Sequence, residues 1–150
     1  MINKKNQDSE MKTIPAEVAA LIPEDQLRIT ITNLPVYQDG IENLKNWLQK
    51  CPELYKTDGM EEHPAVFHYF FGSTDIYICE YDGKDRMFGY AVLGGDLNNS
   101  EWRYFNLSEL TSIRQLNIDY HFMEQSVEEA LYNAYPNHFK KPKSAGNKPS

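Results

Sequence analysis

The chain has 150 residues, of which 41% are hydrophobic and 13% aromatic, and its formal net charge is −7. This composition predicts one folded domain with a hydrophobic core and excludes a chain that is disordered throughout. No apolar run approaches the roughly 20 residues of a membrane span, and the polar N-terminus lacks the apolar segment of a secretory signal. We therefore expect a soluble, cytoplasmic protein.

The charge is unevenly distributed along the chain. Seven lysines lie in the two ends, so residues 13–139 retain 8 basic against 20 acidic groups, a net charge of −12. Such a body repels a phosphate backbone, because nucleic-acid binding requires clustered Lys and Arg. We therefore expect no direct binding of nucleic acid by the folded body. The same charge suits either a basic protein partner or solubility alone.

The N-terminal third carries two predicted helices. Residues 1–12 are polar and aperiodic, which predicts a disordered tail. Pro15 suits the first turn of a helix with a short apolar stripe, namely Val18, Leu21 and Ile22. Residues 24–32 read either as helix or as strand, and their β-branched side chains favour a strand. Asp39 is a good N-cap for a longer helix with the apolar stripe Ile41, Leu44, Trp47 and Leu48.

A β-meander is predicted in the middle of the chain. Strands are expected at residues 66–71 and 74–81, because Gly72 supplies the positive φ that a two-residue type II′ hairpin needs. Counting back from this turn gives one face of the hairpin the side chains of Phe67, Tyr69, Phe71, Ile76 and Ile78. The opposite face then carries His68, Phe70, Tyr77, Cys79 and Tyr81. A second turn at residues 82–85 leads to strands at residues 87–93 and 101–105.

Two capping boxes indicate helix starts in the C-terminal third. In the first, Asn106 is expected to accept a backbone hydrogen bond at the N-cap while Glu109 reaches back to it. In the second, Ser126 and Glu129 have the same relation and open a helix carrying Val127, Ala130, Leu131 and Tyr135. A short strand is predicted between the two boxes, at residues 118–122.

These elements predict a single α+β domain over residues 13–136. Its sheet is expected to be a four-stranded antiparallel meander with helices packed on it. Residues 137–150 are basic and rich in Pro, Gly and Ser, which predicts a second disordered tail.

No catalytic or metal-binding motif is present in the sequence. The four histidines lack the spacing of a zinc site, and the two cysteines, Cys51 and Cys79, stand alone rather than as a CxxC pair. We therefore predict no cofactor and no metal. One enzymatic hypothesis remains, in which His68 opposite Tyr77 acts as a general base with a nearby carboxylate. The alternative is an ordinary hydrogen-bonded histidine in a strand.

The meander contains more aromatic residues than a four-stranded sheet needs. They form either a core with a half-exposed tyrosine layer or a recognition surface, since tyrosine and tryptophan contribute strongly to protein interfaces. Tyr81 and Tyr104 are the side chains most expected to be exposed. The candidate partner-binding residues are Tyr77, Tyr81, Trp102, Tyr104 and Glu80.

Four short segments also carry a family resemblance: Pro52-Glu53-Leu54-Tyr55, Tyr77-Ile78-Cys79-Glu80-Tyr81-Asp82, Phe88-Gly89, and Tyr104-Phe105-Asn106-Leu107-Ser108-Glu109-Leu110. Over these residues the chain resembles a bacterial family designated domain of unknown function 2958. The last segment is the most specific, because family members read Gly-Tyr-Phe-Ser-Leu-Ser-Glu-Leu or close to it. Here Arg103 replaces the Gly and Asn106 the first Ser. The family's later Glu-Arg-Asp-x-x-Phe pattern is kept only in part, at residues 119–122.

The resemblance implies an accessory protein carried by plasmids and conjugative elements, and it implies no particular activity. With the acidic body and the dense tyrosines, it favours a non-enzymatic module that binds another protein, with a basic partner as one option. The enzymatic hypothesis around His68 and Tyr77 is the alternative.

Overall fold

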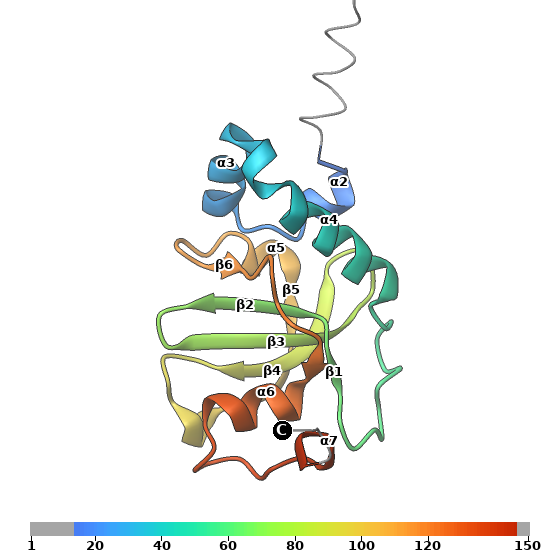
Figure 1. Ribbon diagram of the computed structural model, residues 1–150, viewed down its shortest axis with the longest axis vertical. Coiled ribbons are helices and arrows are strands. Elements are labelled where there is room, and N and C mark those ends of the chain that lie inside the picture. The colour runs from blue at the N-terminus through green and yellow to red at the C-terminus, as the bar shows by residue number, and fades with distance from the viewer. Residues whose placement is uncertain (1–13, 147–150) are drawn as a thin grey trace, which may run out of the picture.

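The computed structural model describes residues 14–146, and its elements are labelled in Figure 1. They are α2 (Ala16–Ala19), α3 (Glu24–Thr32), α4 (Leu34–Lys50), β1 (Pro64–Ala65), β2 (Phe67–Phe71), β3 (Thr74–Tyr81), β4 (Arg86–Val92), η1 (Leu97–Asn99), β5 (Glu101–Asn106), α5 (Leu107–Leu110), β6 (Asn117–Ile118), β7 (Gln125–Ser126), α6 (Val127–Ala134) and α7 (Lys143–Gly146). The α+β fold class is confirmed. The N-terminal tail predicted at residues 1–12 lies outside the described residues.

The main sheet is antiparallel and has the strand order β5-β4-β3-β2-β6. The meander β2 to β5 follows the prediction, and β6 adds a fifth strand beside β2. The strand expected at residues 118–122 is shorter than predicted, because the chain leaves the sheet after Ile118 to bury Tyr120 beneath the N-terminal helices. A separate two-stranded ladder joins β1 to β7.

The first hairpin has the predicted register. Phe71 pairs with Thr74, Phe67 pairs with Ile78, and Gly72 has a φ of +55°. This positive φ is the conformation that glycine adopts most readily. The hairpin therefore follows from local turn chemistry, and Phe67, Tyr69, Ile76 and Ile78 lie together in one buried core.

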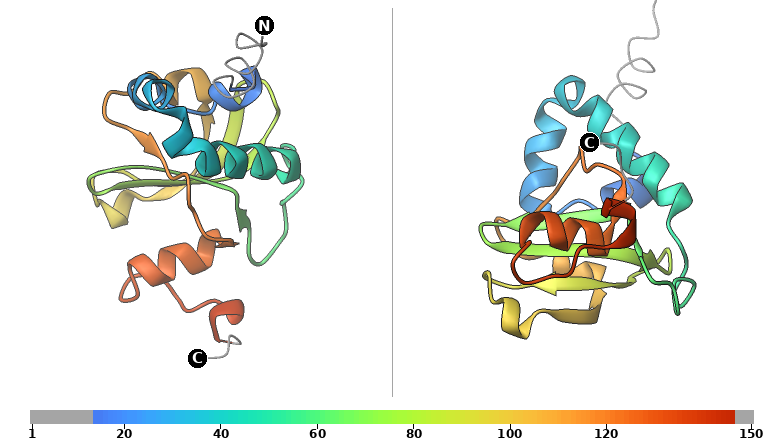
Figure 2. Two further views of the ribbon diagram at one scale, coloured as in Figure 1. Left: turned by 45° about the horizontal axis from the view of Figure 1, so that its top comes forward. Right: turned by 60° about the horizontal axis from the view of Figure 1, so that its bottom comes forward.

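The sheet separates two hydrophobic layers. Helices α2, α3 and α4 cover one face, whereas α6 covers the other, as the left view of Figure 2 shows. The first core includes Val18, Leu21, Leu44, Phe67, Tyr69, Ile78, Met87 and Leu110. The second includes Ala65, Tyr77, Cys79, Val92, Val127, Ala130 and Leu131. The residues of the predicted stripes do pack on these cores, although Leu21 and Ile22 follow the end of α2 and Tyr135 follows the end of α6.

Residues 24–32 form helix α3 and not the strand that their β-branched side chains favoured. The helix packs through Leu27 and Thr30, which are three positions apart and therefore share a helix face. The Thr30 hydroxyl lies 2.7 Å from the Tyr120 hydroxyl, so its polar group is paired although it is buried. Ile29 and Ile31, which suggested a strand, are exposed. Tertiary contacts outweigh the weak propensity here.

Helix α4 begins at Leu34, five residues before the predicted N-cap at Asp39. Pro35 lies in its first turn, where its missing N–H has no cost. Gly40 sits in the middle of the helix because Tyr120 passes directly beneath it. A Cβ at this position would lie 2.6 Å from Cβ of Tyr120. The predicted stripe of α4 does face the core, with Ile41 and Leu44 fully buried.

A β-bulge in β3 changes the face of the residues that follow it. Ile78 pairs with Gly89 but Glu80 pairs with Phe88, so Cys79 is the extra residue. Glu80 therefore lies on the second face, and Tyr81 enters the first core with Met87. The prediction that Tyr81 shares a face with Tyr77 and Cys79 is wrong, because it assumed a regular strand.

Helix α5 starts where the first capping box predicted, but a different residue caps it. The Asn106 side chain accepts no backbone hydrogen bond, and its Nδ2 donates to Glu109 Oε1 over 3.4 Å. In the turn before β4, the main-chain carbonyl of Asp85 accepts from the Leu107 N–H at 2.6 Å, and its Oδ1 accepts from the Ser108 N–H at 2.8 Å. The second box is confirmed at its N-cap, where the Glu129 N–H donates to Ser126 Oγ.

The cap from Asp85 gives a testable difference. Replacing Asp85 with alanine removes a charge-assisted bond to the helix start and should lower the free energy of unfolding by about 1 to 2 kcal/mol. Replacing Asn106 with alanine should change it by less than about 0.5 kcal/mol. Urea denaturation of both variants measures the two effects. If Asn106→Ala lowered the free energy of unfolding more than Asp85→Ala does, Asn106 would be the residue that caps α5.

The sequence predicted a disordered basic tail over residues 137–150. In the structure, residues 137–146 follow α6 on the same side of the sheet and end in α7, which lies beside α6. Phe139 packs on the second core, which a purely compositional reading of the tail could not detect. Residues 147–150 lie outside the described part of the chain.

Candidate protein-binding surface

A row of aromatic side chains crosses the second face of the sheet. Strand register builds its centre, since β4 and β5 place Phe88 opposite Tyr104 and Tyr90 opposite Trp102. Neighbouring ring centroids along the row lie 4.8 to 6.3 Å apart. The members of this aromatic row, in order, are Tyr55, Tyr104, Phe88, Trp102, Tyr90, Phe139 and Tyr135.

One end of the aromatic row is open to solvent. Tyr55 is 62% exposed and Tyr104 is 41% exposed. The Tyr104 ring rests on Phe88 at 4.8 Å, and the Arg86 guanidinium carbon lies 5.4 Å from its centroid. These contacts hold the rings in place before any partner binds, which lowers the entropic cost of using them in an interface.

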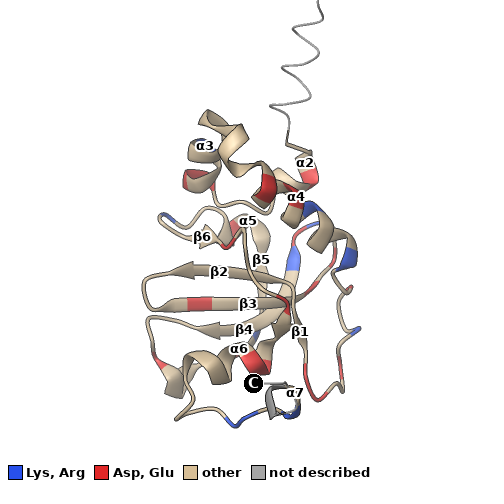
Figure 3. Cartoon of the chain, viewed as in Figure 1, with Lys and Arg blue, Asp and Glu red and all other residues tan. Residues whose placement is uncertain are grey.

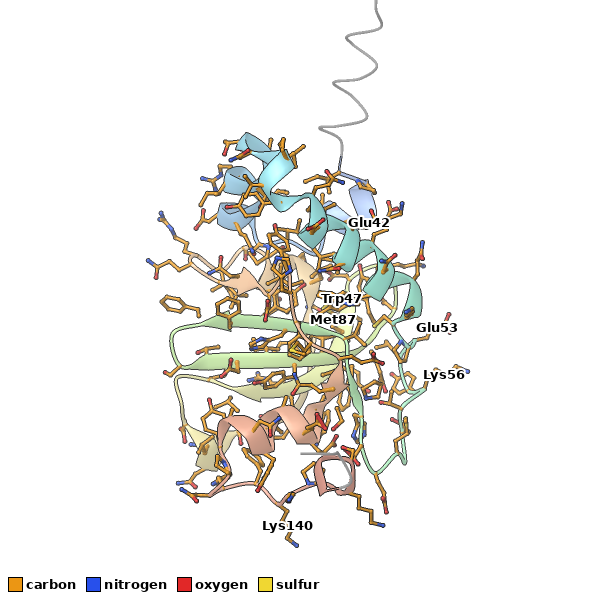
Figure 4. All side chains as sticks on the ribbon, in the orientation of Figure 1. Glu42, Trp47, Glu53, Lys56, Met87 and Lys140 are labelled. Atoms are coloured by element: carbon orange, nitrogen blue, oxygen red, sulfur yellow. The ribbon has the colours of Figure 1, made fainter. Side chains whose placement is uncertain are left out.

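The segment between α4 and β1 brings acidic charge to this end of the row. Residues 53–62 contain Glu53, Asp58, Glu61 and Glu62 against a single Lys56. Of these carboxylates, Asp58 acts on Tyr104, whereas Glu61 and Glu62 contact Lys143 and Ser144 near the C-terminus. Figure 3 shows acid at several points of the segment, and Figure 4 shows Glu53 and Lys56 projecting into solvent. Partial desolvation, contact with the Tyr55 hydroxyl and the charges of Glu80 and Asp58 raise the pKa of Tyr104. Its hydroxyl therefore remains a donor at neutral pH.

Glu80 is a buried residue that holds residues 53–62 through hydrogen bonds. It is fully buried, and its carboxylate accepts from the Tyr55 N–H at 2.8 Å and the Thr57 N–H at 3.0 Å. The Thr57 hydroxyl also donates to Oε2. These bonds fix Tyr55, whose φ of +71° is unusual for a residue other than glycine. Glu80 thus positions the exposed ring rather than contacting a partner.

The structure divides the five candidate binding residues. Trp102 and Tyr104 belong to the aromatic row, whereas Tyr77, Tyr81 and Glu80 are buried. Tyr81 in particular was expected to be exposed, and the bulge at Cys79 buries it. Tyr55 and Phe139 complete the row although the sequence did not indicate them. An aromatic residue in an otherwise polar loop was the available signal for Tyr55.

His68 and Tyr77 do come together with carboxylates. Their rings stack at 4.7 Å, and His68 Nε2 lies 2.7 Å from Asp75 Oδ1. The second ring nitrogen is buried without a hydrogen bond, 3.8 Å from Asp119 Oδ2. Asp75 also accepts from the Tyr135 hydroxyl at 3.0 Å, so the cluster joins α6 to the sheet.

Access to this cluster is restricted by Phe122. Its ring lies 5.2 Å from that of His68 and 6.1 Å from that of Tyr77. A cavity of about 250 Å³ opens beside Phe122, but its lining includes neither His68 nor Tyr77. The cavity is lined by Trp47, Lys50, Pro52, Pro64, Ala65, Val66, Phe122, Glu124 and Gln125. The geometry therefore joins the residues of the enzymatic hypothesis, but the cavity beside Phe122 does not reach them.

Metal binding and cysteine chemistry receive little support from the part of the chain that the structure describes. Between residues 14 and 146, no three His, Cys, Asp or Glu side chains are grouped in a way that could hold a metal ion. Burial raises the pKa of Cys51 and of Cys79 to about 12, so both remain thiols at neutral pH. Within the same residues, no helix has the length and apolar character required to cross a membrane.

Comparison of the chain with protein-family models, with curated proteins and with solved structures finds no match.

Proposed function

We propose that the protein is a non-enzymatic module that binds another protein through the exposed end of the aromatic row. The observation that carries this proposal is the pair of exposed rings, Tyr55 and Tyr104, held by tilted ring contacts beside an acidic segment. Tyrosine provides a large contact area with few rotatable bonds, which is why it is common where interface energy concentrates. The partner chemistry that fits is a basic surface with a pocket for these rings.

The setting of this function rests on the family resemblance. We propose an accessory protein of a bacterial mobile element that works in the cytoplasm and meets a host or element protein there. The acidic body supports a protein partner over nucleic acid, because residues 13–139 carry a net charge of −12.

The enzymatic alternative retains one supporting observation. His68 stacks on Tyr77 and lies between Asp75 and Asp119, an arrangement that could orient an imidazole for proton transfer. It ranks second because Phe122 covers the cluster and the adjacent cavity does not reach it.

A capture experiment tests the binding proposal. The immobilised full-length chain is incubated with host lysate, and retained proteins are identified by mass spectrometry. A partner should be retained by the wild type and lost from the double variant Tyr55→Ser and Tyr104→Ser. The matched control is Ile29→Ser with Val36→Ser, which removes two exposed apolar side chains from the helices α3 and α4. Equal loss from both double variants would contradict the proposal.

Salt separates the roles of charge and rings in that complex. Raising salt from about 0.05 to 0.5 M should slow association much more than it speeds dissociation, because charge acts mainly on the encounter. Removing the Tyr104 ring should instead speed dissociation. Surface plasmon resonance with the identified partner measures both rates. An association rate that does not depend on salt would show that the acidic residues 53–62 do not attract the partner.

A further inference from the structure

The C-terminal segment, residues 137–146, occupies the opposite end of the aromatic row. Phe139 meets Tyr90 edge-on at 5.9 Å and Tyr135 at 6.3 Å. Its backbone N–H donates to the Tyr135 carbonyl over 3.1 Å, so the ring is presented by the turn that ends α6. The row is therefore open at Tyr55 and Tyr104 and covered at Tyr90.

The same segment also contacts the acidic residues before β1. The Ser144 N–H donates to Glu62 Oε2 at 3.1 Å, and the Ser144 hydroxyl donates to Glu62 and, at 3.2 Å, to Glu129. Lys143 Nζ lies 3.6 Å from Glu61 Oε2. Figures 1 and 2 show α7 beside α6, on the face of the sheet away from α4. A basic, aromatic segment thus lies on an acidic, aromatic surface.

The contacts of this segment are of a kind that another chain could supply. It joins no β-ladder, since the strands that the structure describes pair only with one another. Lys140, which Figure 4 shows pointing into solvent, and Lys141 are exposed between the two anchors. The exposed ion pair of Lys143 contributes little by itself. Phe139 and Ser144 therefore provide most of the specific contacts.

We infer that the surface under residues 137–146 is a docking site for basic peptide segments, which the chain's own segment occupies until a partner displaces it. The fitting segment has an aromatic residue, lysines after it, and a hydroxyl residue five positions later. Charge complementarity and the seated segment together argue for this occupant. The inference deepens the proposed function, since it adds a second contact for the same basic partner and rests on that proposal.

If residues 137–146 occupy the docking site, they compete with any peptide that is added in solution. A tethered segment acts at an effective concentration in the millimolar range, so the same peptide added in solution should bind the wild-type chain poorly. Loosening the tethered segment should expose the site without altering its walls. The walls are formed by Tyr90, Tyr135, Glu61, Glu62 and Glu129, none of which belongs to the segment.

The experiment uses a fluorescein-labelled peptide with the sequence of residues 137–146 and full-length protein. The variant Phe139→Ala with Ser144→Ala should bind the peptide at least about tenfold more tightly than the wild type, measured by fluorescence anisotropy. Ser144→Ala alone, which leaves the second core intact, should give an intermediate affinity. A peptide in which Phe and Ser are both replaced by Ala is the control and should not bind the opened variant.

Several outcomes would overturn the inference. Equal affinity of wild type and opened variants would show that residues 137–146 do not compete for the site, and equal binding of the control peptide would show that charge alone acts. Dimerisation of the wild type that Phe139→Ala abolishes would assign the site to a second copy. Adding Tyr55→Ser and Tyr104→Ser to a chain should leave its affinity for the peptide unchanged, because these two rings lie outside the docking site. Failure of the peptide test is thereby distinguished from failure of the proposed function.

Discussion

Replacing Glu80 with alanine is expected to lower the free energy of unfolding by about 3 to 5 kcal/mol. The carboxylate is fully buried and accepts hydrogen bonds from two backbone N–H groups and one hydroxyl, at Tyr55 and Thr57. Alanine would leave these donors without an acceptor in a buried site. Urea denaturation followed by tryptophan fluorescence measures the loss.

The matched control for Glu80 is Glu53→Ala, which removes an exposed carboxylate from the segment that Glu80 holds. This change should alter the free energy of unfolding by less than about 0.5 kcal/mol. Limited proteolysis should cut residues 53–62 faster in Glu80→Ala and at the wild-type rate in Glu53→Ala. Similar stability of the two variants would show that the segment does not depend on Glu80.

Local sequence patterns predicted the parts of the fold that local chemistry determines. Gly72 fixes the first hairpin because its positive φ selects the turn, and the register then follows by counting. Ser126 caps α6 through a bond to a residue three positions later. Both features involve neighbours in sequence, which is why a single chain suffices to predict them.

Features that depend on distant partners were not predictable in this way. The cap of α5 comes from Asp85, which lies more than twenty positions before the residues it binds. The bulge at Cys79 leaves no periodic signal, yet it exchanges the faces of Glu80 and Tyr81. One extra residue in a strand therefore made Tyr81 a core residue and Glu80 a buried support.

The candidate surface also contains residues that the sequence predicted and residues that only the folded structure reveals. Trp102 and Tyr104 were predicted because the meander contains more aromatic residues than a four-stranded sheet needs. Tyr55 and Phe139 come from a loop and from a basic tail, and only the folded chain brings them to the same row. Composition indicated the acidic character of the protein, whereas the placement of acid beside the exposed rings required the structure.

The second large effect is expected at Gly89, which follows Phe88 in one of the segments that carry the family resemblance. Gly89→Ala should lower the free energy of unfolding by more than about 3 kcal/mol. A Cβ at this position would lie 2.0 Å from the Tyr77 carbonyl oxygen and 2.9 Å from Cα of Ile78. Both atoms belong to the backbone of β3 next to the bulge, so no side-chain rotation can relieve the contact. The glycine is thus required by close approach of two strands.

Gly72→Ala is the matched control, because a Cβ there meets no atom within 4 Å and only the positive φ opposes it. Its cost should be about 1 kcal/mol. Thermal unfolding followed by circular dichroism compares the two variants, and Gly89→Ala should have the lower midpoint or fail to fold. If Gly89→Ala were as stable as Gly72→Ala, the bulge would have to shift without penalty. Glu80 and Tyr81 could then exchange faces, and the support of Tyr55 by a buried carboxylate would lose its structural basis.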